Sequence, residues 1–427
     1  MKLILNLFKT KVARDSLIYV VSDFINKVIP FALLPILTSF LSPEDYGNLA
    51  LFNSIVSFIS IFIGLSIHGA ISVNYYKMTK LQLSQYVGNV VYILLFTFTL
   101  IILLIFLFKE SLFLNFELPF FWIVLAAFIA LNSFVVLINL SLWLLEQKPK
   151  FYGSYQITET IVNFSLSLLF VIVFLMSWKG RALGTLIGST LSSFISIYLL
   201  YKRGYLNMKF NIAYIKDALH FGVPLVPHQL SFWLRSGAII FLLVNYVGKE
   251  ETGLYNIGAQ LVLPLSVITA AFNKSWAPYL YRKLSNNPTN REKDNIVKFT
   301  YAYFIIILVL VLVILYLAPF VLKYFLNERY SNSYIFIVYL AFSAAFEGMY
   351  LMVVNYIFYE KQTKYLAYIT LFCSIINVML AFALINLNGS VGAAQAHLIS
   401  SILNFGLVWL YSNKIYKMPW KLKRVQD

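Results

Sequence analysis

Residues 15–47 read DSLIYVVSDFINKVIPFALLPILTSFLSPEDYG, and this stretch decides the fold. It opens with an apolar run that carries an acid (Asp23), a base (Lys27) and two prolines (Pro30 and Pro35). The run exceeds the roughly 20 apolar residues that cross the hydrocarbon core of a bilayer. It then turns through residues 41–47 into a second apolar run. The stretch therefore predicts a membrane hairpin with ionisable side chains inside its first helix.

The composition extends this prediction to the whole chain. Its 427 residues are 60% apolar and 12% charged, with a mean hydropathy of +0.79, whereas about a quarter of the residues in a soluble domain are charged. We therefore expect an all-α polytopic membrane protein. Its twelve transmembrane helices are predicted at roughly 16–40, 44–72, 85–108, 118–145, 151–177, 181–201, 219–246, 251–279, 297–322, 332–359, 364–386 and 389–412.

The distribution of positive charge predicts the orientation of these helices. The net charge of +16 comes from cations in short loops rather than from a basic surface, so nucleic acid is not expected as a partner. Of 33 Lys and Arg residues, 24 fall on the side of the N-terminus, six on the other side and three inside spans. The positive-inside rule then places both termini in the cytoplasm. Residues 1–9 are expected to form an interfacial turn rather than a signal peptide.

Two motifs repeat along the chain. The sequence EDYG at 44–47 aligns with EETG at 250–253, a shift of 206, and Glu146, Lys150 and Asn163 align with Glu360, Lys364 and Asn377 at a shift of 214. We therefore expect two six-helix lobes, residues 1–208 and 209–427, related by a pseudo-twofold axis along the membrane normal. The amphipathic segment 209–222 is expected to be a linker helix on the inner surface, with a regulatory role as the alternative.

Nine ionisable residues fall inside the predicted spans, where such groups normally face partners or water. They are Asp23, Lys27, His68, Glu159, His228, Arg235, Lys274, Glu347 and His397. Asp23 and Lys27 are four residues apart and can pair on one helix face. Arg235 has no acid within a turn of its own helix, so its partner must come from another span, lipid or substrate.

These residues divide into two predicted groups. A cationic cavity for substrate would contain Lys27, His68, Arg235 and Lys274, although snorkelling is an alternative for Lys274. Coupling or other polar roles are predicted for Asp23, Glu159, Asn163, Glu347 and His397. Glu159 and Asn163 belong to a polar stripe on the fifth span that is either interhelical glue or a cavity lining. Glu347 is a candidate proton or cation site, and His397 is either a proton relay or a buried, hydrogen-bonded side chain.

The sequence carries no motif of a conventional enzyme, and neither a cofactor nor a metal ion is expected. There is no Gly-rich phosphate loop, no nucleophile elbow, and no cluster of Cys or His at metal-ligand spacing. The single cysteine, Cys373, lies in an apolar run and is expected to pack in the core.

The chain resembles the polysaccharide and O-antigen flippases, the lipid-linked oligosaccharide translocases of the multidrug/oligosaccharidyl-lipid/polysaccharide exporter superfamily. The residues that carry the resemblance are PFALLPILTSFLSPEDYGNLALFNS at 30–54, its echo VGKEETGLYNIGAQLVLPL at 247–265, and the loops EQKPKFY and EKQTKYL at 146–152 and 360–366.

The resemblance implies a V-shaped bundle that moves a polyprenyl-diphosphate-linked glycan from the inner to the outer leaflet of the bacterial inner membrane by alternating access. Membrane lipid, H⁺ or Na⁺, and polysaccharide assembly proteins are the further partners considered. Two other functions compete: a drug/cation antiporter of the same superfamily, and a membrane-embedded polysaccharide polymerase or ligase. A purely structural scaffold does not account for the nine intramembrane ionisable residues.

Overall fold

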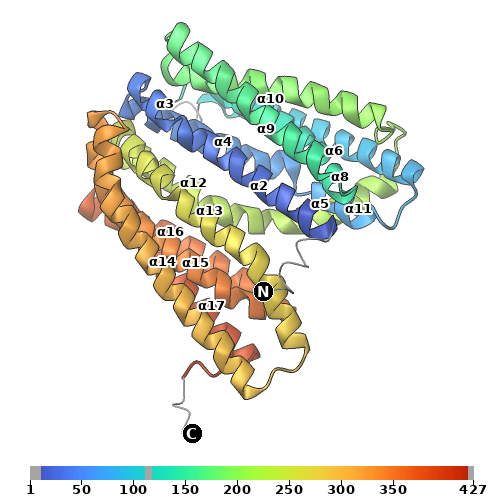
Figure 1. The fold of residues 1–427 in the computed structure, drawn as a ribbon. Helices are drawn as coiled ribbons and strands as arrows, with labels where there is room; N and C mark the ends of the chain where they lie inside the picture. Colours follow the sequence, from blue (N-terminus) through green and yellow to red (C-terminus); the bar gives the residue numbers. More distant parts are fainter. Residues whose placement is uncertain (1–10, 111–117, 422–427) are drawn as a thin grey trace. The chain divides into compact units, whose positions relative to one another are not determined.

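The computed structural model describes the backbone of residues 11–110 and 118–421, and these ranges are helical with short connections (Figure 1). The interfacial turn expected at residues 1–9 lies outside the described residues. Helices and closed barrels are the only folds that satisfy every backbone hydrogen bond in hydrocarbon. Twelve helical segments in the described part are long and apolar enough to cross a membrane, one for each span that the sequence predicts.

The chain divides into two compact units, residues 1–233 and 234–427. The helices of the first unit are α2 (Lys11–Ala32), α3 (Leu34–Phe40), α4 (Pro43–Gly64), α5 (His68–Asn74), α6 (Lys80–Leu107), α8 (Phe120–Leu145), α9 (Pro149–Leu168), α10 (Ser177–Lys202) and α11 (Ile212–Gly222). A π-helical turn, η1 (Leu169–Val173), follows α9, and a 3₁₀ turn, η2 (Val223–Leu225), leads into α12 (Val226–Val247), which crosses the boundary between the units. The second unit continues with α13 (Lys249–Ser285), α14 (Asn290–Tyr324), the 3₁₀ helix η3 (Glu328–Ser333), α15 (Tyr334–Tyr359), α16 (Thr363–Asn388) and α17 (Ser390–Ile415).

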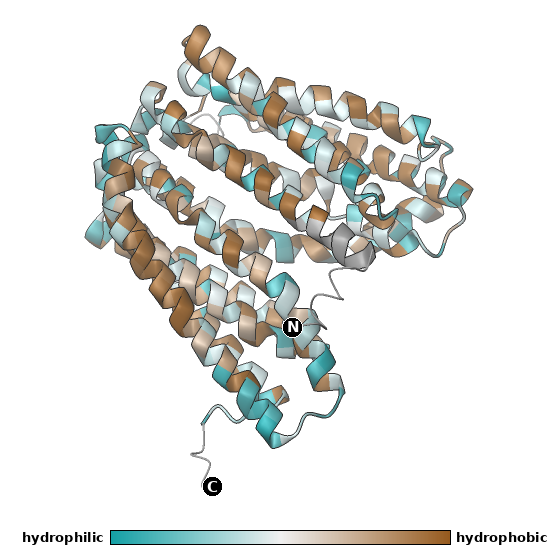
Figure 2. Cartoon of the chain, viewed as in Figure 1, coloured by the Kyte–Doolittle hydropathy of each residue, from teal (hydrophilic) through white to brown (hydrophobic). Residues whose placement is uncertain are grey.

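Each unit repeats the same packing order. In the first unit α4 packs on α8, α8 on α10, and α9 on α10, and in the second α13 packs on α15, α15 on α17, and α16 on α17. The third span of each unit is its most apolar, with mean hydropathies of 3.0 for α6 and 3.3 for α14. Figure 2 shows α14 apolar along most of its length and hydrophilic at the end that begins at Asn290. Both helices bury little of their length inside the protein, as expected for helices that face lipid.

The boundary between the units differs from the predicted one at residues 208 and 209 because the linker packs on the first unit. The helix predicted at 209–222 forms as α11. Tyr86 of α6 donates a hydrogen bond to Asp217 at 2.7 Å, and Asn89 of α6 accepts one from the backbone N–H of Asn211 at 2.8 Å. These polar contacts fix the linker helix to α6. The contacts alone define these units, so the division into six-helix lobes at residues 208 and 209 stays a prediction.

The prolines and glycines produce fewer breaks than the sequence suggests. The first span breaks at Leu33, just before α3 begins at Leu34 with Pro35 as its second residue, and the seventh is interrupted at η2. By contrast, α13 runs unbroken through Pro264 and Pro278. The second span ends at Gly64, short of the predicted residue 72, because Leu65 and Ser66 adopt left-handed conformations with φ of 43° and 55°. His68 therefore opens a separate short helix, α5.

Candidate functional site

A polar cluster in the second unit is built around Arg235 of α12. Its Nη2 lies 3.0 Å from Oε1 of Glu347 on α15 and donates a hydrogen bond to Oγ of Ser401 on α17 at 3.1 Å. The side chains of Arg235 and Glu347 are 19% and 37% exposed. The sequence left the partner of Arg235 open between another span, lipid and substrate. In the structure the partner comes from other spans.

The cluster extends across α15, α16 and α17. Ser343 of α15 lies 2.8 Å from Oγ of Ser401 and 3.2 Å from Nδ1 of His397. From α16, Asn377 donates to the backbone carbonyl of Arg235 at 3.1 Å. An ion pair away from water is favourable only when further hydrogen bonds satisfy its atoms. The hydroxyls of Ser343 and Ser401 supply some of these hydrogen bonds and link the ion pair to His397.

The first unit holds its own intramembrane cation, Arg181 of α10. Its Nη1 donates to Oδ1 of Asn163 and Oγ of Ser167, both at 2.6 Å, and to Oγ1 of Thr185 at 2.8 Å. The guanidinium also lies over the Phe164 ring, with Cζ 4.1 Å from the ring centroid, which is cation–π geometry. Among the described residues no carboxylate pairs with Arg181. Neutral oxygens and an aromatic face therefore solvate this charge.

Glycines bring Arg181 to these partners. Gly184 and Gly188 follow on the same face of α10, where a Cβ on Gly184 would come within 2.5 Å of the Ser167 backbone and one on Gly188 within 2.9 Å of Asn163 Cα. Small residues four apart allow two membrane helices to approach closely. The close contact places the side chain at position 181 of α10 directly against the polar residues of α9.

The polar stripe of α9 contacts two neighbouring helices. On one side the Tyr152 hydroxyl donates to Asp23 of α2 at 3.4 Å, and Thr160 donates to the side chain of Asn26. On the other side Asn163 contacts α10, as described above. Most of the stripe is thus interhelical contact, one of the two alternatives that the sequence left open. Glu159 instead borders a pocket.

The pocket beside Glu159 has a volume of about 420 Å³. Aromatic side chains line it together with hydroxyls, and the residues include Trp143, Phe151, Tyr155, Thr158 and Ser192. This mixture of aromatic surface with a few polar groups is typical of a small-molecule site. Glu159 is thus a predicted polar residue that the structure places at a pocket lining.

The remaining predicted site residues are Lys27, His68 and Lys274. Lys27 and Lys274 are exposed along α2 and α13, and His68 is half-buried with its ring 5.6 Å from that of Phe134 in edge-to-face geometry. Nδ1 of His68 is buried without a hydrogen-bond partner among the described residues. Lys27 and His68 belong to the first unit, whereas Arg235 and Lys274 belong to the second. Their shared cationic cavity stays a prediction.

The repeated acidic motif has a structural role in both units. In the first, Ser42 and Asp45 form a capping box at the start of α4, and Asp45 also accepts a hydrogen bond from Ser177, the first residue of α10. In the second, Glu251 accepts one from Ser390, the first residue of α17, at 2.6 Å. Since Glu251 aligns with Asp45 in the repeat, the motif ties the second span of each unit to its sixth.

The other repeated loop is also held by ion pairs. Glu146, between α8 and α9, lies 2.9 Å from Nζ of Lys148 and 3.0 Å from Nη2 of Arg203, and accepts a hydrogen bond from Tyr205 at 2.7 Å. Partial burial opposes ionisation of this carboxyl, but the bonds from Lys148, Tyr205 and Arg203 outweigh it and hold the pKa of Glu146 below its usual value. The loop motif EQK therefore anchors the end of α10.

Sequence reasoning missed Arg181 because it placed the residue at the boundary of the sixth span and counted it with the outer loop. Two signals could have found it. Gly180, Gly184 and Gly188 repeat every four residues, which predicts a helix that packs closely, and Arg181 lies on that helix one residue after the first of them. Asn163 and Ser167 form a polar pair of the same spacing on the preceding helix.

Twelve spans with charged clusters inside them define a multi-pass membrane protein of the transporter and flippase class. The family model described as "Polysaccharide biosynthesis protein" matches residues 12–283. The chain belongs to this family of polysaccharide biosynthesis proteins.

Relatives and solved structures agree with this assignment. The chain is 28% identical over 376 residues to a membrane protein of Haemophilus influenzae, an alignment that covers 86% of this chain and 88% of that one. It is 24% identical over 405 residues to the capsular polysaccharide biosynthesis protein CapF of Staphylococcus aureus, covering 93% and 98%.

Among solved structures, the lipid II flippase MurJ in an inward closed conformation has a TM-score of 0.72 at 16% identity, covering 93% of this chain and 87% of MurJ. An inward-facing multidrug resistance transporter of the MATE family has a TM-score of 0.69 at 15% identity, covering 93% of each chain. At these identities the likeness establishes the shared twelve-helix fold.

Proposed function

We propose that this protein translocates a polyprenyl-diphosphate-linked oligosaccharide from the inner to the outer leaflet of a bacterial inner membrane by alternating access, with both termini in the cytoplasm. The observation that carries the proposal is the presence of a guanidinium inside the spans of each unit, Arg181 in one and Arg235 in the other. Such groups are expensive to place in hydrocarbon and mark ligand or ion pathways. A diphosphate is a ligand that guanidinium groups bind well, because they present a planar set of donors.

The polar cluster of the second unit supports coupling to an ion. The carboxylate of Glu347 contacts Arg235, and hydroxyls connect that pair to the His397 ring. When Glu347 accepts a proton, the guanidinium loses its counter-charge and becomes available to an anionic ligand. Proton binding and diphosphate binding would then favour each other. Na⁺ is the alternative coupling ion.

A drug/cation antiporter is the second candidate, and the pocket beside Glu159 is the observation that favours it. A carboxylate among aromatic side chains in about 420 Å³ suits an organic cation. The fold is also shared with a MATE family transporter. The family match to polysaccharide biosynthesis proteins favours the flippase.

The test is complementation of a strain that lacks the chromosomal gene. Lys274→Ala and the double variant Arg235→Gln/Glu347→Gln remove intramembrane cations, and the double variant leaves no bare carboxylate behind. We expect both to lose surface polysaccharide and to accumulate lipid-linked oligosaccharide on the inner leaflet, at protein levels matching the parent. Lys323→Ala, an exposed cation near the end of α14, is the matched control and should complement fully.

Full complementation by both test variants would overturn the cationic site. An unchanged leaflet distribution in the deletion strain, together with a raised intracellular concentration of a fluorescent organic cation, would instead establish the antiporter.

A further inference from the structure

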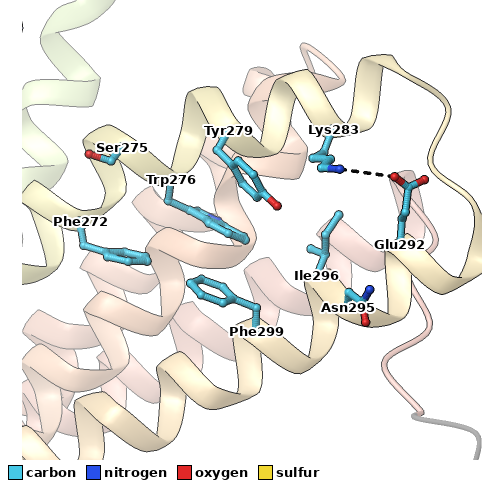
Figure 3. Close-up of a pocket in the computed structure, with 9 residues that line it drawn as sticks. All are labelled: Phe272, Ser275, Trp276, Tyr279, Lys283, Glu292, Asn295, Ile296 and Phe299. Carbon is cyan, nitrogen blue, oxygen red and sulfur yellow. Dashed lines mark hydrogen bonds and ion pairs between the residues drawn. The ribbon is translucent and has the colours of Figure 1, made fainter. Parts of the chain in front are cut away.

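A pocket of about 410 Å³ lies between the end of α13 and the start of α14 (Figure 3). From α13 it is lined by Phe272, Ser275, Trp276, Tyr279 and Lys283, and from α14 by Glu292, Asn295, Ile296 and Phe299. It does not include any of the residues assigned to the polar clusters above. All of its lining belongs to the second unit.

The pocket is apolar at one end and polar at the other. At the apolar end the rings of Trp276 and Phe299 stack with centroids 4.9 Å apart, and Phe272 stacks beside them. At the other end, next to the loop that joins the helices, are Lys283 and Asn295 (Figure 3). Along the helix axes the pocket lining changes from aromatic to polar, in the direction from the hydrocarbon toward the membrane surface. This order matches the order of parts in a lipid, with its acyl chain inward and its headgroup outward.

The charge around the polar end fits an anionic headgroup. Residues 274–298 contain six cations and two acids: Lys274, Arg282, Lys283, Arg291, Lys293 and Lys298, against Glu292 and Asp294. The opposite ends of the helices in this unit have balanced charges: Lys249, Lys323 and Arg329 against Glu250, Glu251 and Glu328. Basic pockets between membrane helices on the cytoplasmic side are typical sites for anionic lipid headgroups.

The ion pair at the pocket leaves Lys283 available. Nζ of Lys283 is 3.4 Å from Oε1 of Glu292, and the two side chains are 36% and 44% exposed. An exposed pair of this kind contributes little to stability. Glu292 is also engaged by the helix cap, because its Oε2 accepts from the backbone N–H of Thr289 at 2.9 Å. Lys283 can therefore turn to a phosphate at little cost.

Two further groups in the pocket suit a lipid. The side chains of Phe299 and Tyr279 are 46% and 41% exposed, which leaves aromatic surface for an acyl chain to cover. Trp276 is 5% exposed and supplies a buried aromatic wall against which that chain would pack.

We propose that this pocket binds an anionic phospholipid of the inner leaflet, with its phosphate at Lys283 and an acyl chain along Trp276 and Phe299. The site does not depend on what the protein transports. Its bound lipid would fill the gap between α13 and α14, whose backbones approach each other at few places and which are otherwise joined by the aromatic stack and the Lys283–Glu292 pair.

The experiment is native mass spectrometry of the purified full-length protein after equilibration with equal amounts of phosphatidylglycerol, phosphatidylcholine and undecaprenyl phosphate. We expect phosphatidylglycerol to be retained at least threefold over phosphatidylcholine. Lys283→Gln should abolish that preference and Phe299→Ala should lower the retention of both phospholipids, while Lys323→Gln, a change at an exposed lysine near the other end of α14, should leave retention and preference intact.

Equal retention of the two phospholipids would overturn the proposal, since an apolar groove alone would explain it. Preferential retention of undecaprenyl phosphate that Lys283→Gln removes would also overturn it and assign the pocket to the lipid carrier. The melting temperature of each variant, measured without added lipid, identifies any variant that fails to fold. For such a variant the milder Phe299→Leu replaces Phe299→Ala, and a preference that survives Lys283→Gln overturns the proposal.

Discussion

Arg181 and Arg235 both place a guanidinium inside a membrane span, yet the two units hold it differently. Arg235 contacts the carboxylate of Glu347, whereas Arg181 is held by three neutral oxygens and the face of Phe164. The charge of the first cation is therefore fixed, because no proton binding in its surroundings can expose it further. The second cation keeps its charge as well, but whether a neighbouring carboxylate neutralises that charge depends on Glu347. We infer that any ion coupling resides in the second unit.

The same substitution at both positions tests this difference, and the larger effect is expected at Arg235. Arg235→Gln leaves Glu347 without its cation, and removing one partner of a buried ion pair costs about 3–5 kcal/mol. Because Glu347 is 37% exposed, we expect a loss below that range, about 2–3 kcal/mol in the free energy of unfolding. Glu347→Gln added to Arg235→Gln should recover most of that loss.

The chain offers its own probe for this measurement. Cys373 is its single cysteine, and its side chain is 1% exposed within the second unit. A thiol-reactive fluorophore therefore reports the unfolding of that unit during a thermal ramp. If the double variant unfolds at the same temperature as Arg235→Gln alone, the ion pair is not what stabilises the cluster, and the comparison with Arg181 fails.

A smaller difference in the free energy of unfolding is expected between variants of the two serines that begin α10 and α17. Ser390→Ala removes the hydroxyl that donates to Glu251, and hydrogen bonds to charged groups contribute about 1.5–3 kcal/mol. Ser177→Ala should cost less, about 0.5–1 kcal/mol, because Asp45 keeps the hydrogen bonds from Ser42 at 2.8 and 2.9 Å.

Thermal unfolding of the two serine variants checks this order, with Ser331→Ala in η3 as an exposed control. Equal losses at Ser177 and Ser390 would mean that the capping box at Ser42 does not support Asp45.

The twelve spans were predictable from sequence because apolar runs of sufficient length leave few alternatives in hydrocarbon. The repeat was predictable as well, since its acidic motif lies at matching places in both halves. The end of the second span was not predictable. It depends on left-handed conformations at Leu65 and Ser66, and neither residue is of a type that usually marks such a turn. A turn without its usual residues is set by tertiary packing, which a single sequence does not reveal.

The candidate site was predictable in its residue types and not in its contacts. Glu347 and His397 stood out singly as ionisable groups in apolar runs, but their link to Arg235 through Ser343 and Ser401 joins helices more than 100 residues apart in the chain. Arg181 was assigned to a loop because its position near a span boundary made it look exposed. Hydrophobic periodicity identifies the helices, but it does not tell which distant helices pack against each other.

Arg181→Gln should have the smallest effect on stability and so completes the comparison. The substitution removes a charge whose partners Asn163, Ser167 and Thr185 are all neutral, so no bare carboxylate remains, and the amide of Gln can still donate to one of them. We expect a change within about 1 kcal/mol in the free energy of unfolding. To report on the first unit, the measurement uses Cys373→Ser with Ala126→Cys, since Ala126 of α8 is fully buried there. If polysaccharide export falls while this unfolding temperature holds, Arg181 serves the ligand rather than the fold. A loss as large as that of Arg235→Gln would show that a charged group outside the described contacts depends on Arg181, and the proposed division between a fixed and a switchable cation would be wrong.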